Sequence, residues 1–181
     1  AMEERVREAL QEFKPEERET ATFIFTAHSI PMSMASSSSY ERQLRESCRL
    51  VTERFHRSDF ILAWQSRSGA PHIPWLEPDV NDVIRGLSGV RNVVIIPIGF
   101  ISDHIEVLHD LDHEALETAA SVGVKAARAK TVGTHPKFVA GVADLLVERL
   151  RGREERSYCG VLGPWHDVCP AGCCPSGRMK F

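Results

Sequence analysis

Apolar residues recur along the chain in two alternating patterns, which together predict an α/β fold. Short runs of β-branched, aliphatic and aromatic residues predict buried strands, whereas apolar residues spaced three or four apart predict amphipathic helices. The predicted strands cover 20–26, 60–64, 92–97 and, more weakly, 124–132. The predicted helices cover 2–13, 40–55, 79–87, 105–122 and 136–151. Because helices separate the strands, we expect a parallel four-stranded sheet in a three-layer, Rossmann-like domain.

The composition fits one compact domain and narrows the classes of partner. The chain has 181 residues, of which 43% are hydrophobic and 26% are charged, and its formal net charge is -3. Its basic residues are scattered, so we expect no binding of nucleic acid. The longest apolar run, 93–101, is about half as long as a bilayer crossing needs, and the amino-terminal segment lacks a signal-peptide core. We therefore expect a cytoplasmic protein without a membrane span and, from its start at Ala1, a fragment.

Polar residues with catalytic potential follow three of the predicted strands. His28 comes just after the first strand, residues 65–67 follow the second, and His104 and Glu106 follow the third. Because the carboxyl ends of parallel strands share one edge of the sheet, we expect these residues to lie together. A neutral histidine there can bind a metal or accept protons near neutral pH, although a lone histidine after a strand is more often structural.

Three acids occupy every fourth position of the predicted helix 105–122. Glu106, Asp110 and Glu114 form one acidic row, with steps of about 6 Å if the helix is regular. Such a row is often a solvated helix face. Beside His104 and His28, it also fits a path for a divalent cation, because carboxylates and imidazoles can pass a metal from ligand to ligand.

Four sequence stretches carry a resemblance to a known family. They are Thr-Ala-His28-Ser-Ile-Pro, Ala-Trp-Gln-Ser66-Arg67-Ser-Gly, Pro-Trp75-Leu-Glu-Pro, and Pro-Ile-Gly-Phe100-Ile-Ser-Asp-His104-Ile-Glu106. In order and spacing they are similar to the carboxyl-terminal half of the ferrochelatases, over residues 20–150. The resemblance implies a chelatase-like domain that acts in haem biosynthesis. Members of the family insert Fe²⁺ into a porphyrin that is held between two similar Rossmann-like halves.

The resemblance also implies roles for individual residues. Catalysis is implied for His28 and Glu106, and metal handling for His28, His104, Glu106, Asp110 and Glu114. Porphyrin contacts are implied for Trp75, Phe100, Ser66 and Arg67, of which the last two lie where propionates are held. These residue types suit the chemistry, because aromatic rings suit a flat macrocycle and imidazoles and carboxylates bind iron and accept pyrrole protons. The two aromatic residues also fit simple core packing.

The family's amino-terminal half, which forms the opposite wall of the porphyrin pocket, has no counterpart in this sequence. We therefore expect residues 1–151 to be a chelatase-like domain with little or no activity unless a missing amino-terminal half is supplied. A second interpretation is a small chelatase, two copies of which pair as a homodimer. A third is a regulatory module that binds an iron–sulfur cluster or zinc and has lost catalysis.

Residues 152–181 form a cysteine-rich tail. It contains Cys159, Cys169, Cys173 and Cys174, four of the five cysteines. Clustered thiols in a cytoplasmic protein predict a Zn²⁺ site or a [2Fe-2S] cluster rather than disulfides. The resemblance favours the cluster, since many ferrochelatases bind one through three cysteines of a carboxyl-terminal extension and a fourth from the earlier part of the chain. Either Cys173 or Cys174 then completes a trio with Cys159 and Cys169, whose fourth ligand lies in the missing half, or both serve and the set is complete. Cys48, on the apolar face of its predicted helix, is expected to be a buried thiol.

The same resemblance indicates a substrate. The cysteine-rich tail and the Trp-Gln-Ser-Arg-Ser-Gly stretch are most similar to the ferrochelatases of actinobacteria. That group commonly acts on coproporphyrin III, so we expect coproporphyrin III in preference to protoporphyrin IX.

Overall fold

The computed structural model describes residues 1–152 and 155–171 of the chain. At its centre is a four-stranded sheet in the order β2-β1-β3-β4, in which every neighbouring pair is parallel. The strands are β1 (Thr22–His28), β2 (Ile61–Gln65), β3 (Asn92–Ile96) and β4 (Lys125–Arg128). Both central strands are buried along most of their length, as expected for a parallel sheet that is covered on two faces. The predicted fold is confirmed, including its weak fourth strand.

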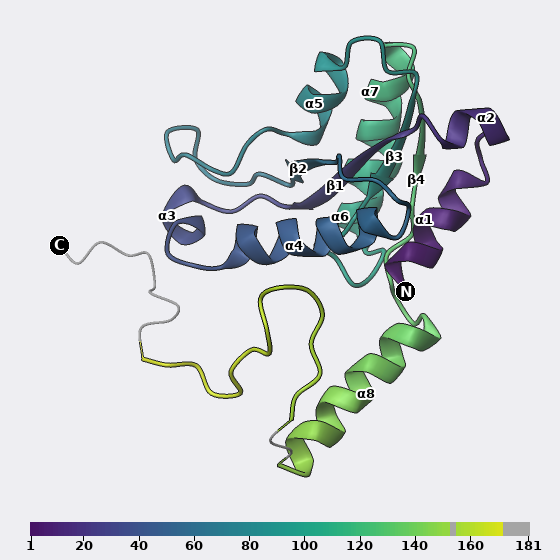
Figure 1. Cartoon of the computed structure of the whole chain (residues 1–181). Helices are drawn as coiled ribbons and strands as arrows, with labels where there is room; N and C mark the ends of the chain where they lie inside the picture. Colours follow the sequence, from purple (N-terminus) through teal and green to yellow (C-terminus); the bar gives the residue numbers. More distant parts are fainter. Residues whose placement is uncertain (153–154, 172–181) are drawn as a thin grey trace.

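Helices cover both faces of the sheet and complete the three layers (Figure 1). They are α1 (Met2–Leu10) and α4 (Tyr40–Glu53) on one face, and α5 (Val80–Gly86) and α7 (Leu116–Ser121) on the other. Cys48 lies on the inner side of α4 and is fully buried. Burial raises the pKa of its thiol to about 12, so Cys48 is an uncharged core residue at neutral pH.

The predicted helix over 105–122 is present, but its middle part is not an α-helix. It consists of α6 (Ile105–Val107), the π-helix η1 (Leu108–Ala115) and α7. Its buried residues recur at every fourth position. In a regular α-helix, a row of residues with this spacing drifts gradually around the helix axis. These residues are Val107, Leu111, Ala115 and Ala119. The wider π-helical turn keeps this apolar stripe on the sheet, and it also changes which polar side chains lie together.

Smaller differences occur elsewhere in the first half of the chain. The sequence pattern does not predict two short helices, α2 (Pro15–Arg18) and α3 (Met32–Ala35). Pro15 starts α2, where its fixed φ angle suits the first helical turn. β1 also runs two residues further than predicted, so His28 is the last residue of the strand rather than the residue after it.

Helix α8 (Pro136–Leu150) extends away from the sheet (Figure 1). At its start, His135 Nε2 lies 2.6 Å from Glu4 Oε2, which ties the helix to α1. None of the residues of α8 is buried within the described part of the chain. The helices of the described residues include none that is long and apolar enough to cross a bilayer.

Residues 155–171 of the tail return from the end of α8 toward α4. The backbone N–H of Val161 donates to Glu46 Oε1 at 2.7 Å, which anchors the tail on that helix. Arg49 and this N–H lower the pKa of Glu46 to about 2. The carboxylate therefore remains charged, and the anchor intact, even in the acidic range where an ordinary glutamate becomes protonated.

Candidate active site

Polar residues from the first three strands lie at one edge of the sheet. His28 ends β1 and Gln65 ends β2, and the two residues are paired directly in the sheet register. Residues 97–104 lead from β3 into α6, and the N–H of Gly99 donates to the carbonyl oxygen of Thr26 at 3.1 Å. This bond holds the connection against β1, and Glu106 on α6 then lies within reach of His28.

The His28 imidazole and the Glu106 carboxylate form the centre of the site. His28 Nδ1 lies 2.5 Å from the carbonyl oxygen of Ser29, which can only accept, so Nδ1 carries the proton. In the neutral ring, Nε2 therefore presents a lone pair, and it lies 3.4 Å from Glu106 Oε1. Two proton acceptors that face each other at this distance favour a proton or a divalent cation between them. The side chains are 35% and 46% exposed, so a ligand can reach both.

Tyr40 supports His28 from α4. Its hydroxyl donates to the carbonyl oxygen of His28 at 2.9 Å. Burial raises the pKa of Tyr40, so the hydroxyl remains a donor at neutral pH. The sequence prediction does not include Tyr40, because the pattern places it only as the first residue of a helix.

A second set of ligand atoms lies on η1. His109 Nδ1 is 3.5 Å from Asp110 Oδ1 and 3.9 Å from Glu114 Oε1, and all three ligand atoms lie within 4.8 Å of one another. Two carboxylates and an imidazole suit a divalent transition metal. The sequence prediction includes Asp110 and Glu114 but not His109, because residues five apart lie on different sides of an α-helix. A π-helix bonds each residue to the one five positions on, so His109 and Glu114 share a side.

Asp110 connects this set to the sheet edge. Its Oδ2 accepts a hydrogen bond from Gln65 Nε2 at 3.2 Å and another from the hydroxyl of Ser66. The φ angle of Ser66 is 61°, in the left-handed region that costs a non-glycine residue about 1–2 kcal/mol. This strained turn at the end of β2 directs the hydroxyl at η1 and orients the Asp110 carboxylate.

The predicted propionate-binding residues have other partners in this structure. Ser66 is hydrogen-bonded to Asp110. Arg67 donates to the carbonyl oxygens of Pro71 and Ile73, at 3.2 and 3.1 Å, and so holds the proline-containing loop that leads toward Trp75.

The two predicted porphyrin-wall residues differ in burial. Phe100 is 9% exposed and packs in the core beside α5 and α7, with its ring centroid 5.6 Å from that of His104. Trp75 is partly exposed, and its indole lies directly against Gly69, where a Cβ atom would overlap the ring. The indole Nε1 is buried without a hydrogen-bond partner in the described structure. The indole can therefore occupy this position only because residue 69 has no side chain.

Arg128, which the sequence prediction does not include, ties the middle of η1 to the connection before α6. Its guanidinium donates to both carboxylate oxygens of Asp112 at 2.6 and 2.7 Å, and to Asp103 at 2.7 Å. Burial lowers the pKa of Arg128, but the bonds to the two carboxylates outweigh this effect and raise it. The arginine at the end of the weak fourth strand is the sequence signal for this support.

The described residues do not gather the thiolates that an iron–sulfur cluster requires. Cys159 and Cys169 are exposed, and Cys48 is buried in the domain. Cys173 and Cys174 lie outside the described residues. Within the described ranges, the one group of three potential metal ligands is the set on η1.

Comparisons with known proteins place the site in a family context. The profile of the family described as Ferrochelatase matches residues 1–150. A protein named Ferrochelatase from Rhodopirellula baltica is 54% identical over 154 residues, which cover 83% of this chain and 44% of that protein. Proteins named Coproporphyrin III ferrochelatase from Streptomyces griseus and Tropheryma whipplei are 45% and 44% identical, over 95% and 87% of this chain and 52% and 45% of their own. The chain thus spans about half the length of the curated relatives it matches.

Proposed function

The chain belongs to the ferrochelatase family, and we propose that it supplies the metal-inserting wall of an enzyme that places Fe²⁺ in a porphyrin during haem biosynthesis. Iron and porphyrin are both substrates of this reaction. The observation that carries the proposal is the lone pair of His28 Nε2, which faces Glu106 Oε1 across 3.4 Å. Porphyrin metallation must remove two pyrrole protons and replace the ligands of the iron, and this pair can accept a proton or a metal.

In this proposal, the residues at the sheet edge act in sequence. His28 accepts one pyrrole proton at Nε2, and Glu106 opposite it exchanges ligands with the iron and accepts the other proton. Asp110 and Glu114 lead the iron toward this pair, with His104 beside them. Trp75 and Phe100 contact the macrocycle, and Ser66 and Arg67 contact propionates once their present hydrogen bonds are exchanged.

We propose coproporphyrin III as the porphyrin. Support comes from the names of several relatives, including those from Streptomyces griseus and Streptomyces coelicolor, which cover 95% and 93% of this chain. Both alignments extend beyond the domain into the tail, because the domain alone accounts for fewer residues. The sequence resemblance to actinobacterial enzymes points to the same substrate.

The opposite wall of the site is proposed to come from an amino-terminal ferrochelatase half, which packs against α8. This helix exposes large apolar side chains over its whole length, with exposed fractions between 42% and 84%. They are Val139, Val142, Leu145, Leu146 and Leu150. A helix of this character is normally covered by another protein surface. The relatives are about twice as long as the chain, which favours the other half of the same enzyme over a second copy.

This proposal predicts that metal insertion needs the second half. The 181-residue chain alone is expected to insert little Fe²⁺ into coproporphyrin III under anaerobic conditions, as followed by porphyrin absorbance. Adding the amino-terminal half of the Streptomyces griseus relative should restore insertion. The double variant Leu145→Asp, Leu146→Asp should lower the restored rate by about tenfold or more, because it places charges in the packed face.

Val122→Asp provides the matched control, since Val122 is 44% exposed at the end of α7, away from α8. It should leave the restored rate unchanged. Full activity of the chain as a monomer would contradict the need for a partner. Full activity of a dimer of this chain would identify the second copy as the occupant of α8.

We also propose that the tail, residues 152–181, binds a [2Fe-2S] cluster through Cys159 and Cys169, together with Cys173, Cys174 or both. The prediction is that the anaerobically purified chain has the visible absorbance of such a cluster, with matching iron and sulfide contents. Cys169→Ser should abolish the absorbance, whereas Cys48→Ala should retain it because Cys48 is buried in the domain. A colourless protein that contains one zinc ion would exclude the cluster.

A further inference from the structure

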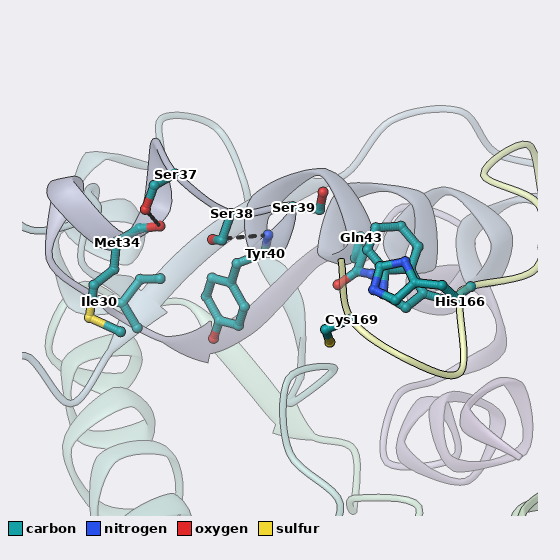
Figure 2. Close-up of a pocket in the computed structure, with 10 residues that line it drawn as sticks. Ile30, Met34, Ser37, Ser38, Ser39, Tyr40, Gln43, His166 and Cys169 are labelled. Atoms are coloured by element: carbon teal, nitrogen blue, oxygen red, sulfur yellow. Dashed lines mark hydrogen bonds between the residues drawn. The ribbon is translucent and has the colours of Figure 1, made fainter. Parts of the chain in front are cut away.

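A cavity of about 430 Å³ lies between the start of α4 and the tail. Figure 2 shows Tyr40 and Gln43 on the α4 side and His166 on the tail side. The described residues that line it supply hydroxyl, amide, imidazole and, from Cys169, thiol groups, but no Asp, Glu, Lys or Arg. An anion that enters this cavity therefore meets hydrogen-bond donors and no opposing carboxylate.

Three of the donors are available to a ligand. Ser39 precedes α4, and its hydroxyl makes no capping hydrogen bond to the helix. Gln43 lies one turn further along and is exposed, and the hydrogen bonds between the residues drawn in Figure 2 do not involve its amide. His166 stacks on Trp165, with ring centroids 5.0 Å apart, which leaves the ring nitrogens at the edge of the stack. A hydroxyl, an amide and an imidazole can donate together to the two oxygens of one carboxylate.

The cavity adjoins the candidate active site. Ile30, one of its lining residues, lies two positions after His28, and Tyr40, another, donates its hydroxyl to the carbonyl oxygen of His28. Ile30 and Trp165 add apolar surface to the lining of the cavity. A porphyrin has the matching character, because its apolar ring carries carboxylates at the edge. When a porphyrin is bound with its nitrogens facing His28, its carboxylate-bearing edge lies beyond His28 and Glu106.

We propose that this cavity binds a ring-edge carboxylate of the porphyrin through Ser39, Gln43 and His166. The proposal rests on the proposed function and adds a substrate-binding site that includes the tail. It gives the tail a role in porphyrin binding that does not depend on a cluster.

The test uses substitutions of Gln43 that change its charge with little change in length. The dissociation constants for coproporphyrin III and for its tetramethyl ester are measured by porphyrin fluorescence, without added metal. The protein is the 181-residue chain assembled with the amino-terminal half of the Streptomyces griseus relative. Gln43→Glu should weaken binding of coproporphyrin III by about tenfold through charge repulsion, and Gln43→Lys should strengthen it. Neither variant should change binding of the ester, which has no charged carboxylate. His166→Ala should weaken binding of the acid severalfold and leave the ester unchanged.

Gln11→Glu is the control, because it makes the same substitution at an exposed position after α1. It should leave both constants unchanged. If the Gln43 variants shift the acid and the ester equally, or shift neither, the carboxylate site is excluded while porphyrin binding itself still stands. If the unaltered assembled enzyme binds neither porphyrin, the result contradicts the proposed function as well as this site.

Discussion

Replacing His28 with alanine in the assembled enzyme is expected to slow metal insertion into coproporphyrin III by about 10²–10⁴-fold, the range for loss of a general base. The reason lies in the hydrogen bond between Nδ1 and the carbonyl oxygen of Ser29, which leaves Nε2 as the free base opposite Glu106. The measurement is the initial rate of Fe²⁺ insertion in the presence of the amino-terminal half. Porphyrin affinity, measured separately by fluorescence, should change much less because the aromatic contacts remain.

His72→Ala is the matched control for this prediction. His72 is exposed in the loop between β2 and α5, so its loss should leave the rate unchanged. If His28→Ala kept the rate within about threefold of the unaltered enzyme, another group would have to accept the pyrrole protons.

Glu106→Gln keeps the size of the side chain and removes its charge. This variant should also slow metal insertion. If Glu106 exchanges ligands with the iron, the Fe²⁺ concentration that gives the half-maximal rate should rise as well.

The layered parallel sheet could be predicted because its determinants are local. Each buried strand is a short apolar run, and the helices between the strands leave parallel pairing as the simple solution. Even the Ala-rich β4 is found where the sequence predicts a weak strand. The end of β1 could be predicted only to within two residues, because polar residues such as His28 can pair in a strand when their neighbours hold the register.

The finer geometry of the site could not be predicted, because it depends on contacts between distant parts of the chain. The π-helix depends on how the apolar stripe of η1 fits the sheet, and it is this geometry that brings His109 beside Glu114. The left-handed backbone of Ser66 depends on Asp110, which lies 44 positions away. The support that Arg128 gives to η1 through Asp112 likewise depends on the sheet order.

The close approach of the β3–α6 connection to β1 is another such contact, and it carries the second prediction. A Cβ atom on Gly99 would lie 2.5 Å from the Cβ and 2.8 Å from the Cα of Ala27, the residue before His28. Gly99 does not have a left-handed backbone, so glycine is needed there for space rather than for conformation. Gly99→Ala is therefore expected to destabilise the fold by about 1–3 kcal/mol, the usual cost of overpacking, as measured by denaturant unfolding.

Gly86→Ala makes the same change where the structure leaves open space, at the last residue of α5. It should stabilise the protein by about 0.5–1 kcal/mol, because alanine loses less backbone freedom than glycine in a helix. A lower unfolding midpoint for Gly99→Ala and a higher one for Gly86→Ala would separate the effect of missing space from that of helix propensity. Gly99→Ala should also slow metal insertion, since the displaced backbone carries His28. A Gly99→Ala variant that unfolds at the unaltered midpoint would contradict the tight packing of this connection on β1.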